Sequence, residues 1–307
     1  MGEINDKLCN LLGKPEYFAD FWNGSVWTLG QKVEAELLSR DDKEYYKFLL
    51  KSSGIRRDVL MKVRGKYAAK LGIELMEKID YTIPARIMDY DAQELKRQLN
   101  DIAVKNRRQG ELEQISWEHG GEFLYGVRLQ DRILPVQTVA LYCGWEEYDG
   151  ACSTLAMCDT MDVPKMYKEQ FGDYTLQLYS LRNLEEERFE TGLRELVAVF
   201  KRCKDKATMK EYYEANRERF RQLDNAVIEA MGALIGRAKL KMFKQEGRGL
   251  DLCKAFEDER EEGREEERIR LSKMIELLYR DGRSDDVLKA ATDMVYQKEV
   301  LAAYGLL

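Results

Sequence analysis

Two acidic residues, Asp58 and Glu74, are the side chains whose placement in the sequence best suits chemistry. They lie on two predicted strands joined by a short turn, each on the polar side of its strand. Because neighbouring strands lie about 4.8 Å apart, carboxylates on one face and near one end can share a divalent ion. A Mg²⁺ ion held there would suit phosphodiester hydrolysis, since it polarises a phosphate and lowers the pKa of water. Acids on strands are also ordinary surface residues, so the pair alone leaves both interpretations open.

The cations around these acids suit a phosphate backbone. Residues 51–110 carry 14 Lys or Arg against 8 Asp or Glu, a local charge of +6 in a chain whose net charge is −6. This segment is either a solvated basic surface or a surface that faces phosphates. The basic residues expected to hold the backbone are Arg56, Arg57, Lys62 and Arg64.

A predicted hairpin would position the two acids. Apolar and polar residues alternate with a period of two through residues 56–64 and again through residues 69–79, which is strand spacing. Gly65-Lys66 supplies the turn between the two strands. On the second strand, the side that carries the acid is expected to present Glu74, Met76 and Lys78.

The remaining elements predict an α/β core. A long amphipathic helix is expected over residues 84–106, with Thr82 as its N-cap and Pro84 in its first turn. Its buried apolar face is expected at Met88, Ala92, Leu95, Leu99 and Ile102, and its exposed side at Arg86, Lys96, Arg97, Arg107 and Arg108. Residues 5–38 are expected to be helical, with an interruption at Pro15, and further strands are expected over residues 122–130, 133–143 and 174–181.

From residue 184 onward the sequence is helical in character. We therefore expect the α/β core to span residues 1–183, a helical extension residues 184–256, and a charged connector with a small helical module residues 257–307. The Glu- and Arg-rich connector is typical of a solvated helix or a flexible link, with a partner-binding segment as the alternative. The C-terminal helices are the expected surface of a homo-oligomer.

Composition narrows the class of protein. The chain has 307 residues, of which 44% are hydrophobic and 35% charged, enough for one large or two modest domains. No segment approaches the roughly 18–20 apolar residues of a membrane-spanning helix, and residues 1–7 are polar, so we expect a cytoplasmic protein without a membrane partner. Six scattered cysteines and one histidine disfavour zinc sites and disulfide frameworks.

Several segments share their residues and order with a known family. The densest match comprises Arg57-Asp58-Val59-Leu60, Gly72-Ile73-Glu74 and the run Asp80-Tyr81-Thr82-Ile83-Pro84-Ala85-Arg86-Ile87-Met88-Asp89-Tyr90-Asp91. Sparser matches follow in order at Pro135-Val136, Gly144-Trp145, Asp149-Gly150 and Glu262-Gly263-Arg264-Glu265. In these segments the chain resembles the recombination-promoting nuclease (transposase-like) family of bacterial proteins, which belongs to the PD-(D/E)XK nuclease superfamily.

The resemblance implies a restriction-endonuclease-like mixed sheet flanked by helices, followed by an all-α C-terminal region. It also implies Mg²⁺- or Mn²⁺-dependent DNA cleavage, with Asp58 and Glu74 as metal ligands and the main-chain carbonyl of Leu75 completing the shell. The family usually has Gln or Lys two residues after the second acid, where this chain has Met76. A thioether carries no charge and donates no hydrogen bond, so the water-positioning group is missing there.

Three interpretations of Met76 follow. Lys78 would reach the site with its long side chain and act in its place; the site would bind metal and DNA but cut poorly; or catalysis is lost and the fold is kept for binding. Tyr81 and Arg86 also match the family pattern and would contact a phosphate or a site carboxylate. Their alternatives are a tyrosine packed at the strand end and an arginine in a surface ion pair.

The sequence therefore favours a Mg²⁺-dependent DNA endonuclease of the PD-(D/E)XK transposase-like kind. Its expected catalytic residues are Asp58, Glu74 and Lys78, and Arg86 joins the basic strand residues in binding DNA. The alternative is a non-catalytic DNA-binding or protein-interaction module that retains the nuclease fold.

Overall fold

The computed structural model describes residues 2–30, 32–41, 58–65, 67–113, 117, 119–235, 268–283, 286–287, 289–290 and 293–306. The chain divides into two units, Met1–Gly249 and Leu250–Leu307. Among the described residues, no helix has both the length and the apolar character that crossing a membrane requires.

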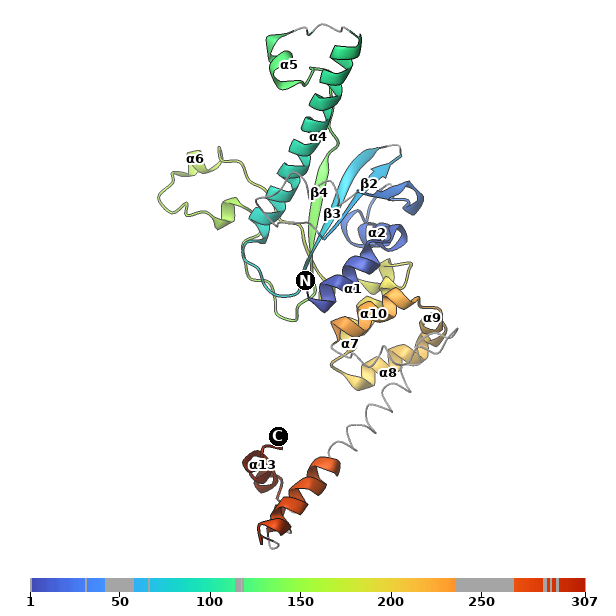
Figure 1. The fold of residues 1–307 in the computed structure, drawn as a ribbon, viewed down its shortest axis with the longest axis vertical. Coiled ribbons are helices and arrows are strands. Elements are labelled where there is room, and N and C mark those ends of the chain that lie inside the picture. Colours follow the sequence, from blue (N-terminus) through green and yellow to red (C-terminus); the bar gives the residue numbers. More distant parts are fainter. Residues whose placement is uncertain are drawn as a thin grey trace. The chain divides into compact units, whose positions relative to one another are not determined.

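A five-stranded mixed sheet forms the centre of the first unit, in the order β1-β2-β3-β4-β5 (Figure 1). Strands β1, β2 and β3 pair antiparallel, whereas β3, β4 and β5 pair parallel. The fold is therefore mixed α/β, as the sequence predicts. The strands are β1 (Leu38–Arg40), β2 (Val59–Arg64), β3 (Ala68–Met76), β4 (Val136–Tyr142) and β5 (Leu178–Ser180).

Strands β2 and β3 form the predicted hairpin. Val59, the first residue of β2, pairs with Ile73, so the preceding residue, Asp58, lies opposite Glu74. Side chains that face each other across a pair of strands lie on the same face of the sheet, so the two acids share one face. Strand β3 ends at Met76, short of the predicted end at residue 79.

The long helix α4 (Ile83–Glu113) connects the parallel strands β3 and β4 and packs against β4 (Figure 1). It begins directly after Thr82 and has Pro84 as its second residue, as predicted. The cluster beneath its first turns shows that the even-numbered residues of β3 and β4 face this helix. This cluster contains Met76, Ile83, Ile87, Tyr90, Ala140, Tyr142 and Leu176.

The side of α4 that faces the sheet differs from the predicted one. Met88 and Leu99, expected in the core, are 41% and 39% exposed. Polar side chains are buried in their place because the strands supply partners: Glu94 forms an ion pair with Lys70 of β3, and Asp91 binds Thr138 of β4. A buried polar group is tolerated when it is paired, and these pairs decide the orientation of the helix. The buried polar residues of α4 are Asp91, Glu94, Gln98 and Asn106.

Before the hairpin, the chain is helical over a shorter range than the predicted 5–38. Helices α1 (Glu3–Leu12) and α2 (Pro15–Phe21) are separated by the extended residue Lys14 and followed by a π-helical turn, Trp22–Val26. Pro15 starts α2 because a proline fits the first position of a helix and interrupts a continuous one. Among the described residues that follow, Ala35–Leu37 form a short helical turn and Leu38–Arg40 form strand β1.

Two further strand predictions need correction. Residues Gly120–Tyr125, which overlap the start of the predicted strand over 122–130, form helix α5, which ends at Gly126 with a φ of 72°. That left-handed conformation favours glycine and stops the helix. Strand β5 occupies only Leu178–Ser180 of the predicted 174–181.

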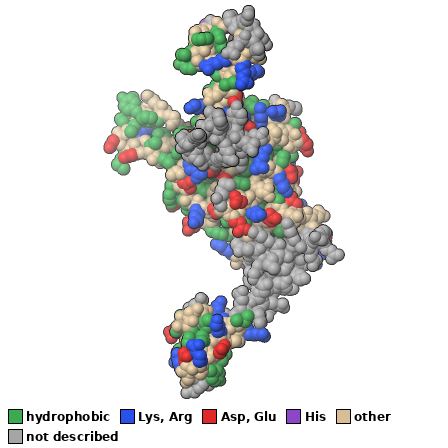
Figure 2. All heavy atoms as spheres, in the orientation of Figure 1, with side chains coloured by type: hydrophobic (Ala, Val, Ile, Leu, Met, Phe, Trp, Pro, Cys, Tyr) green, Lys and Arg blue, Asp and Glu red, His purple; other side chains and the backbone are tan. Residues whose placement is uncertain are grey.

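Short helical segments lie before, between and after the strands. They are Ala35–Leu37 before β1, Leu155–Met157 and α6 (Lys165–Lys168) between β4 and β5, and Leu181–Asn183 and Glu186–Arg188 after β5. Figure 2 shows hydrophobic side chains gathered over the segment that contains α6. The exposed ones there are Met157, Met161, Met166, Tyr167 and Phe171.

The described C-terminal residues are helical, as predicted. In the first unit, α7 (Leu193–Arg202) packs against α10 (Asn225–Leu234), and α10 also packs on α1. Two further helices, α8 (Lys206–Ala215) and α9 (Arg217–Arg221), lie between α7 and α10 in the sequence. In the second unit, a helix over residues 268–280 and α13 (Met294–Ala303) share a small apolar core. Most of the predicted charged connector, residues 257–267, lies outside the described residues.

Candidate active site

The two predicted metal ligands lie together under α4. Asp58 directly precedes β2 and Glu74 lies opposite it on β3; the two residues are only 7% and 2% exposed. The Oδ2 atom of Asp58 accepts a hydrogen bond of 2.8 Å from the main-chain N–H of Leu75, which fixes the aspartate against β3. Two carboxylates are thus held side by side in a region with little access to water.

The surroundings of Glu74 leave part of its charge uncompensated. Its Oε1 atom accepts hydrogen bonds from the Arg86 guanidinium and, at 3.2 Å, from the Tyr90 hydroxyl. Its Oε2 atom is buried and accepts no hydrogen bond from a side chain within the described part of the chain. Burial raises the pKa of Glu74 to about 7, and the Asp58 carboxylate adds to the rise, while Arg86, Tyr90 and the main-chain N–H of Asp58 oppose it. A second cation at Oε2 would stabilise the ionised form.

Arg86 is held in place by three groups. Its guanidinium donates to Glu74, to the Tyr90 hydroxyl at 3.0 Å and to Oδ2 of Asp80. Asp80 in turn accepts hydrogen bonds from the main-chain N–H of Thr82 at 2.8 Å and from its hydroxyl at 2.6 Å. Of the groups considered for Arg86, the structure shows it in contact with the carboxylates of Glu74 and Asp80. The first turn of α4 therefore delivers a fixed positive charge to the acid pair.

Met76 and Lys78, which the sequence places beside the acid pair, lie in two different environments. Met76 shares the face of Glu74, but it is 4% exposed and packs within the apolar cluster beneath α4. Lys78 lies beyond the end of β3, is exposed, and forms no ion pair with a described residue. The idea that Lys78 continues the strand face of Glu74 is wrong, because the strand stops two residues earlier.

The remaining expected site residues are spread over a wider area. The Tyr81 hydroxyl donates a hydrogen bond of 2.9 Å to Asp149, and its side chain is exposed rather than turned to the acid pair. Lys62 and Arg64 lie on the acid-bearing face of β2, four and six residues from Asp58. Arg56 and Arg57 lie outside the described residues.

The donor set fits a magnesium or manganese ion. Mg²⁺ binds proteins through one or two carboxylates and keeps several waters. Asp58 and Oε2 of Glu74 supply two carboxylates, and the Leu75 carbonyl is a third oxygen donor. The N–H and C=O of a strand residue point towards the same neighbouring strand, so this carbonyl faces the side on which Asp58 binds the Leu75 N–H. Among the described residues, no group of three or more His, Cys, Asp or Glu side chains is placed to hold a metal.

Tyr90 and Asp80, to which the sequence alone assigns no role, complete the surroundings of the acid pair. The spacing between Arg86 and Tyr90 is i, i+4, which places two side chains on the same face of a helix. That spacing, read together with the Asp80-x-Thr82 turn before the helix, was the available signal. Glu74 is the partner of both Arg86 and Tyr90. The spacing within the helix could not identify it, because Glu74 lies on β3.

Comparisons of the chain with protein-family models, with curated proteins and with solved structures find no match. The resemblance to the PD-(D/E)XK family therefore stays a prediction, and the function must be argued from the site.

The raised pKa of Glu74 has a consequence for stability. The pKa of a glutamate is normally 4.5, so the rise to about 7 means that the native state binds a proton more tightly than the unfolded chain. The resulting stabilisation is complete below pH 4.5 and is lost as the pH rises through 7. In metal-free protein, Glu74→Gln should therefore raise the free energy of unfolding at pH 8, by on the order of 3 kcal/mol at most, and change it little at pH 4.5.

Urea denaturation in EDTA at the two pH values measures this difference. Glu147→Gln is the matched control, since Glu147 is exposed and has no ion pair with a described residue. An equal change in the free energy of unfolding at both pH values would contradict the account of Glu74.

Proposed function

We propose that this chain is a Mg²⁺-dependent DNA endonuclease of the PD-(D/E)XK transposase-like kind, acting in the cytoplasm. The observation that carries the proposal is the acid pair: two buried carboxylates lie opposite each other, and Oε2 of Glu74 has no side-chain hydrogen-bond donor among the described residues. Buried charges in proteins are generally paired or coordinate metals. A restriction-endonuclease-like core is supported by the antiparallel hairpin, the crossover helix α4 and the parallel strand β4.

The proposed ligands of Mg²⁺ or Mn²⁺ are Asp58, Glu74 and the carbonyl of Leu75. The bound ion would polarise the scissile phosphate and lower the pKa of the attacking water. The protein contributes by fixing the ligands: the Leu75 N–H holds Asp58, and Arg86 and Tyr90 hold one oxygen of Glu74. The other glutamate oxygen is then left to face the ion.

We assign to Arg86 the positive charge that the family pattern expects at the position of Met76. Its guanidinium contacts Glu74, and its side chain is 38% exposed, so it borders both the acid pair and solvent. A phosphate that approaches the pair from solvent would meet this cation. Lys78 is the alternative for the same role, and its position beyond β3 makes it the weaker one.

The burial of Met76 favours a second candidate function, a non-catalytic DNA-binding module that retains the fold. In the apolar cluster beneath α4, the thioether replaces a group that would position water or charge. A third candidate is a protein-interaction module, with the C-terminal helices as the surface of a homo-oligomer.

Supercoiled plasmid separates these candidates. The purified chain is incubated with plasmid in Mg²⁺, in Mn²⁺ and in EDTA, and DNA binding is measured separately in EDTA by gel shift. Nicking that requires the metal supports the endonuclease. Binding without cleavage in either metal favours the non-catalytic module, and neither binding nor cleavage favours the protein-interaction module.

A further inference from the structure

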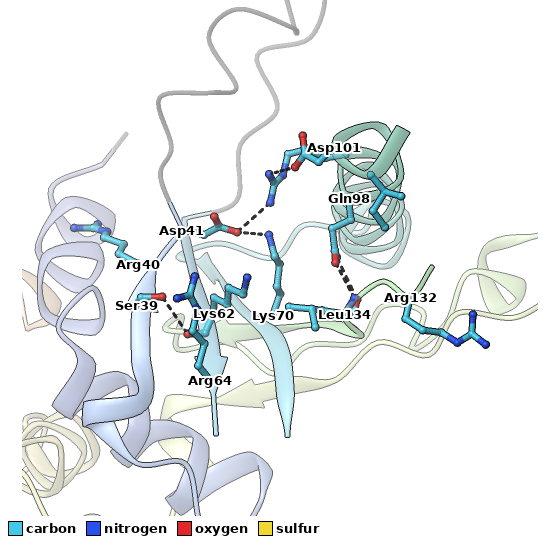
Figure 3. Close-up of a pocket in the computed structure, with 12 residues that line it drawn as sticks. Ser39, Arg40, Asp41, Lys62, Arg64, Lys70, Gln98, Asp101, Arg132 and Leu134 are labelled. Carbon is cyan, nitrogen blue, oxygen red and sulfur yellow. Dashed lines mark hydrogen bonds and ion pairs between the residues drawn. The ribbon is translucent and has the colours of Figure 1, made fainter. Parts of the chain in front are cut away.

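A second charged site lies on the same face of the hairpin as the acid pair. An open pocket of about 430 Å³ is bounded by β1, β2, β3 and α4 (Figure 3). Lys62 pairs across the hairpin with Lys70, four residues along from Asp58 and Glu74. At about 3.3 Å per residue, the pocket lies roughly 13 Å from the acid pair along the strands.

The acids of this pocket already have partners. Lys70, only 3% exposed, forms ion pairs with Asp41 and Glu94. Arg97 binds the same two acids, at 3.3 and 2.8 Å, and Asp101 at 2.9 Å. Figure 3 shows the part of this network that contains Asp41, Lys70 and Asp101, between the strands and α4. The network makes a fixed floor in which each acid is bound to at least one cation.

Lys62 and Arg64 of the pocket have no carboxylate partner among the described residues. Lys62 is half-buried and Arg64 is exposed, and neither forms an ion pair with a described residue. Both lie on the face of β2 that carries Asp58. Lys62 also faces Lys70 directly, but the charge of Lys70 is already paired with Asp41 and Glu94. An anion bound between Lys62 and Arg64 would give these two cations a partner of opposite charge.

The other two arginines of the pocket wall are oriented differently. Figure 3 shows the side chains of Arg40 and Arg132 directed away from the floor network. Arg132 donates hydrogen bonds of 2.6 and 2.8 Å to the carbonyls of Leu129 and Asp131. The anion-binding capacity of the pocket is therefore concentrated at Lys62 and Arg64.

We propose that this pocket holds a backbone phosphate of the nucleic acid, separate from the scissile phosphate, through Lys62 and Arg64. The fork of an arginine matches two phosphate oxygens, and a lysine adds a mobile point charge. The pocket is open, so a continuous backbone can enter it, and its place on the acid-bearing face puts it on the path of a strand that crosses the acid pair. The inference rests on the proposed function, because it takes nucleic acid as the substrate.

The test is DNA binding by the full chain in EDTA, where cleavage cannot interfere. Fluorescence anisotropy with a labelled duplex is measured across a salt series for wild type, for Lys62→Gln/Arg64→Gln, and for Lys165→Gln/Lys210→Gln. The last variant removes two exposed lysines, on α6 and α8, that form no ion pair with a described residue. We expect the pocket variant to bind roughly tenfold more weakly. The slope of log K against log salt should fall by about 1, as for the loss of one phosphate contact.

Folding is checked by thermal melting, which should show the pocket variant about as stable as wild type because neither side chain forms an ion pair with a described residue. Equal weakening in the pocket and control variants, or an unchanged salt slope in the pocket variant, would overturn the proposal. A third outcome would also overturn it: inorganic phosphate raises the melting temperature of wild type but not of the pocket variant, while the two proteins bind DNA equally well. The ligand of the pocket would then be a small phosphate. If the wild-type chain does not cleave plasmid but its DNA binding still depends on Lys62 and Arg64, only the proposed endonuclease activity is contradicted.

Discussion

Nicking of supercoiled plasmid in Mg²⁺ should fall more than about 100-fold in Asp58→Asn and in Glu74→Gln, since loss of groups that only support metal ligands already lowers activity about 10–100-fold. Both substitutions keep the size of the side chain. An amide oxygen at position 58 still accepts the hydrogen bond from the Leu75 N–H, and one at position 74 still accepts from Arg86. Only the negative charge that holds the cation is removed.

The control for this comparison is again Glu147→Gln, which should cut at the wild-type rate. Circular dichroism of each variant confirms that the fold is kept. Nicking within about threefold of wild type in either acid variant would exclude that residue as a metal ligand. Loss of activity in Glu147→Gln would show that the assay responds to surface charge instead.

Removal of Arg86 has the second largest expected effect. Arg86→Gln should lower the cleavage rate by roughly 10²–10³-fold, the range seen when one fixed donor to a developing charge is deleted. Because the Arg86 charge lowers the pKa of Glu74, its removal should also move the acid limb of the pH–rate profile to higher pH. Arg86→Lys keeps the charge and should recover part of both losses.

Lys78→Gln is the matched control, because it removes the cation that the sequence pattern suggests for the same role. We expect wild-type cleavage and an unchanged pH profile in this variant. If Lys78→Gln loses activity while Arg86→Gln keeps the wild-type profile, the positive charge at the site comes from Lys78 and the assignment to Arg86 is wrong.

The hairpin could be predicted because the pattern that specifies it lies within one short segment of the sequence. Apolar residues alternate along β2 and β3, and the turn between them is short, so Asp58 and Glu74 could be placed on one face from the sequence. The same reasoning failed at Lys78, where alternation was extended past the end of the strand. A period of two indicates a face, but the end of a strand depends on its neighbours.

The orientation of α4 could not be predicted because its partners are distant in sequence. The apolar period points to Met88 and Leu99 as the buried face, yet Glu94 and Asp91 are buried there instead. Their partners lie 24 residues before Glu94 and 47 residues after Asp91, on β3 and β4. The contact of Arg86 with Glu74 is of the same kind, and only the assembled sheet and helix show it.

Binding of Mn²⁺ to the full chain tests the central claim most directly. Titration at pH 8, followed by electron paramagnetic resonance, should show a site that Asp58→Asn and Glu74→Gln weaken more than about 100-fold and that Glu147→Gln leaves intact. In wild type the affinity should fall as the pH drops below about 7, because Glu74 then takes up a proton that competes with the ion. Binding of equal strength in wild type and both acid variants would contradict the account.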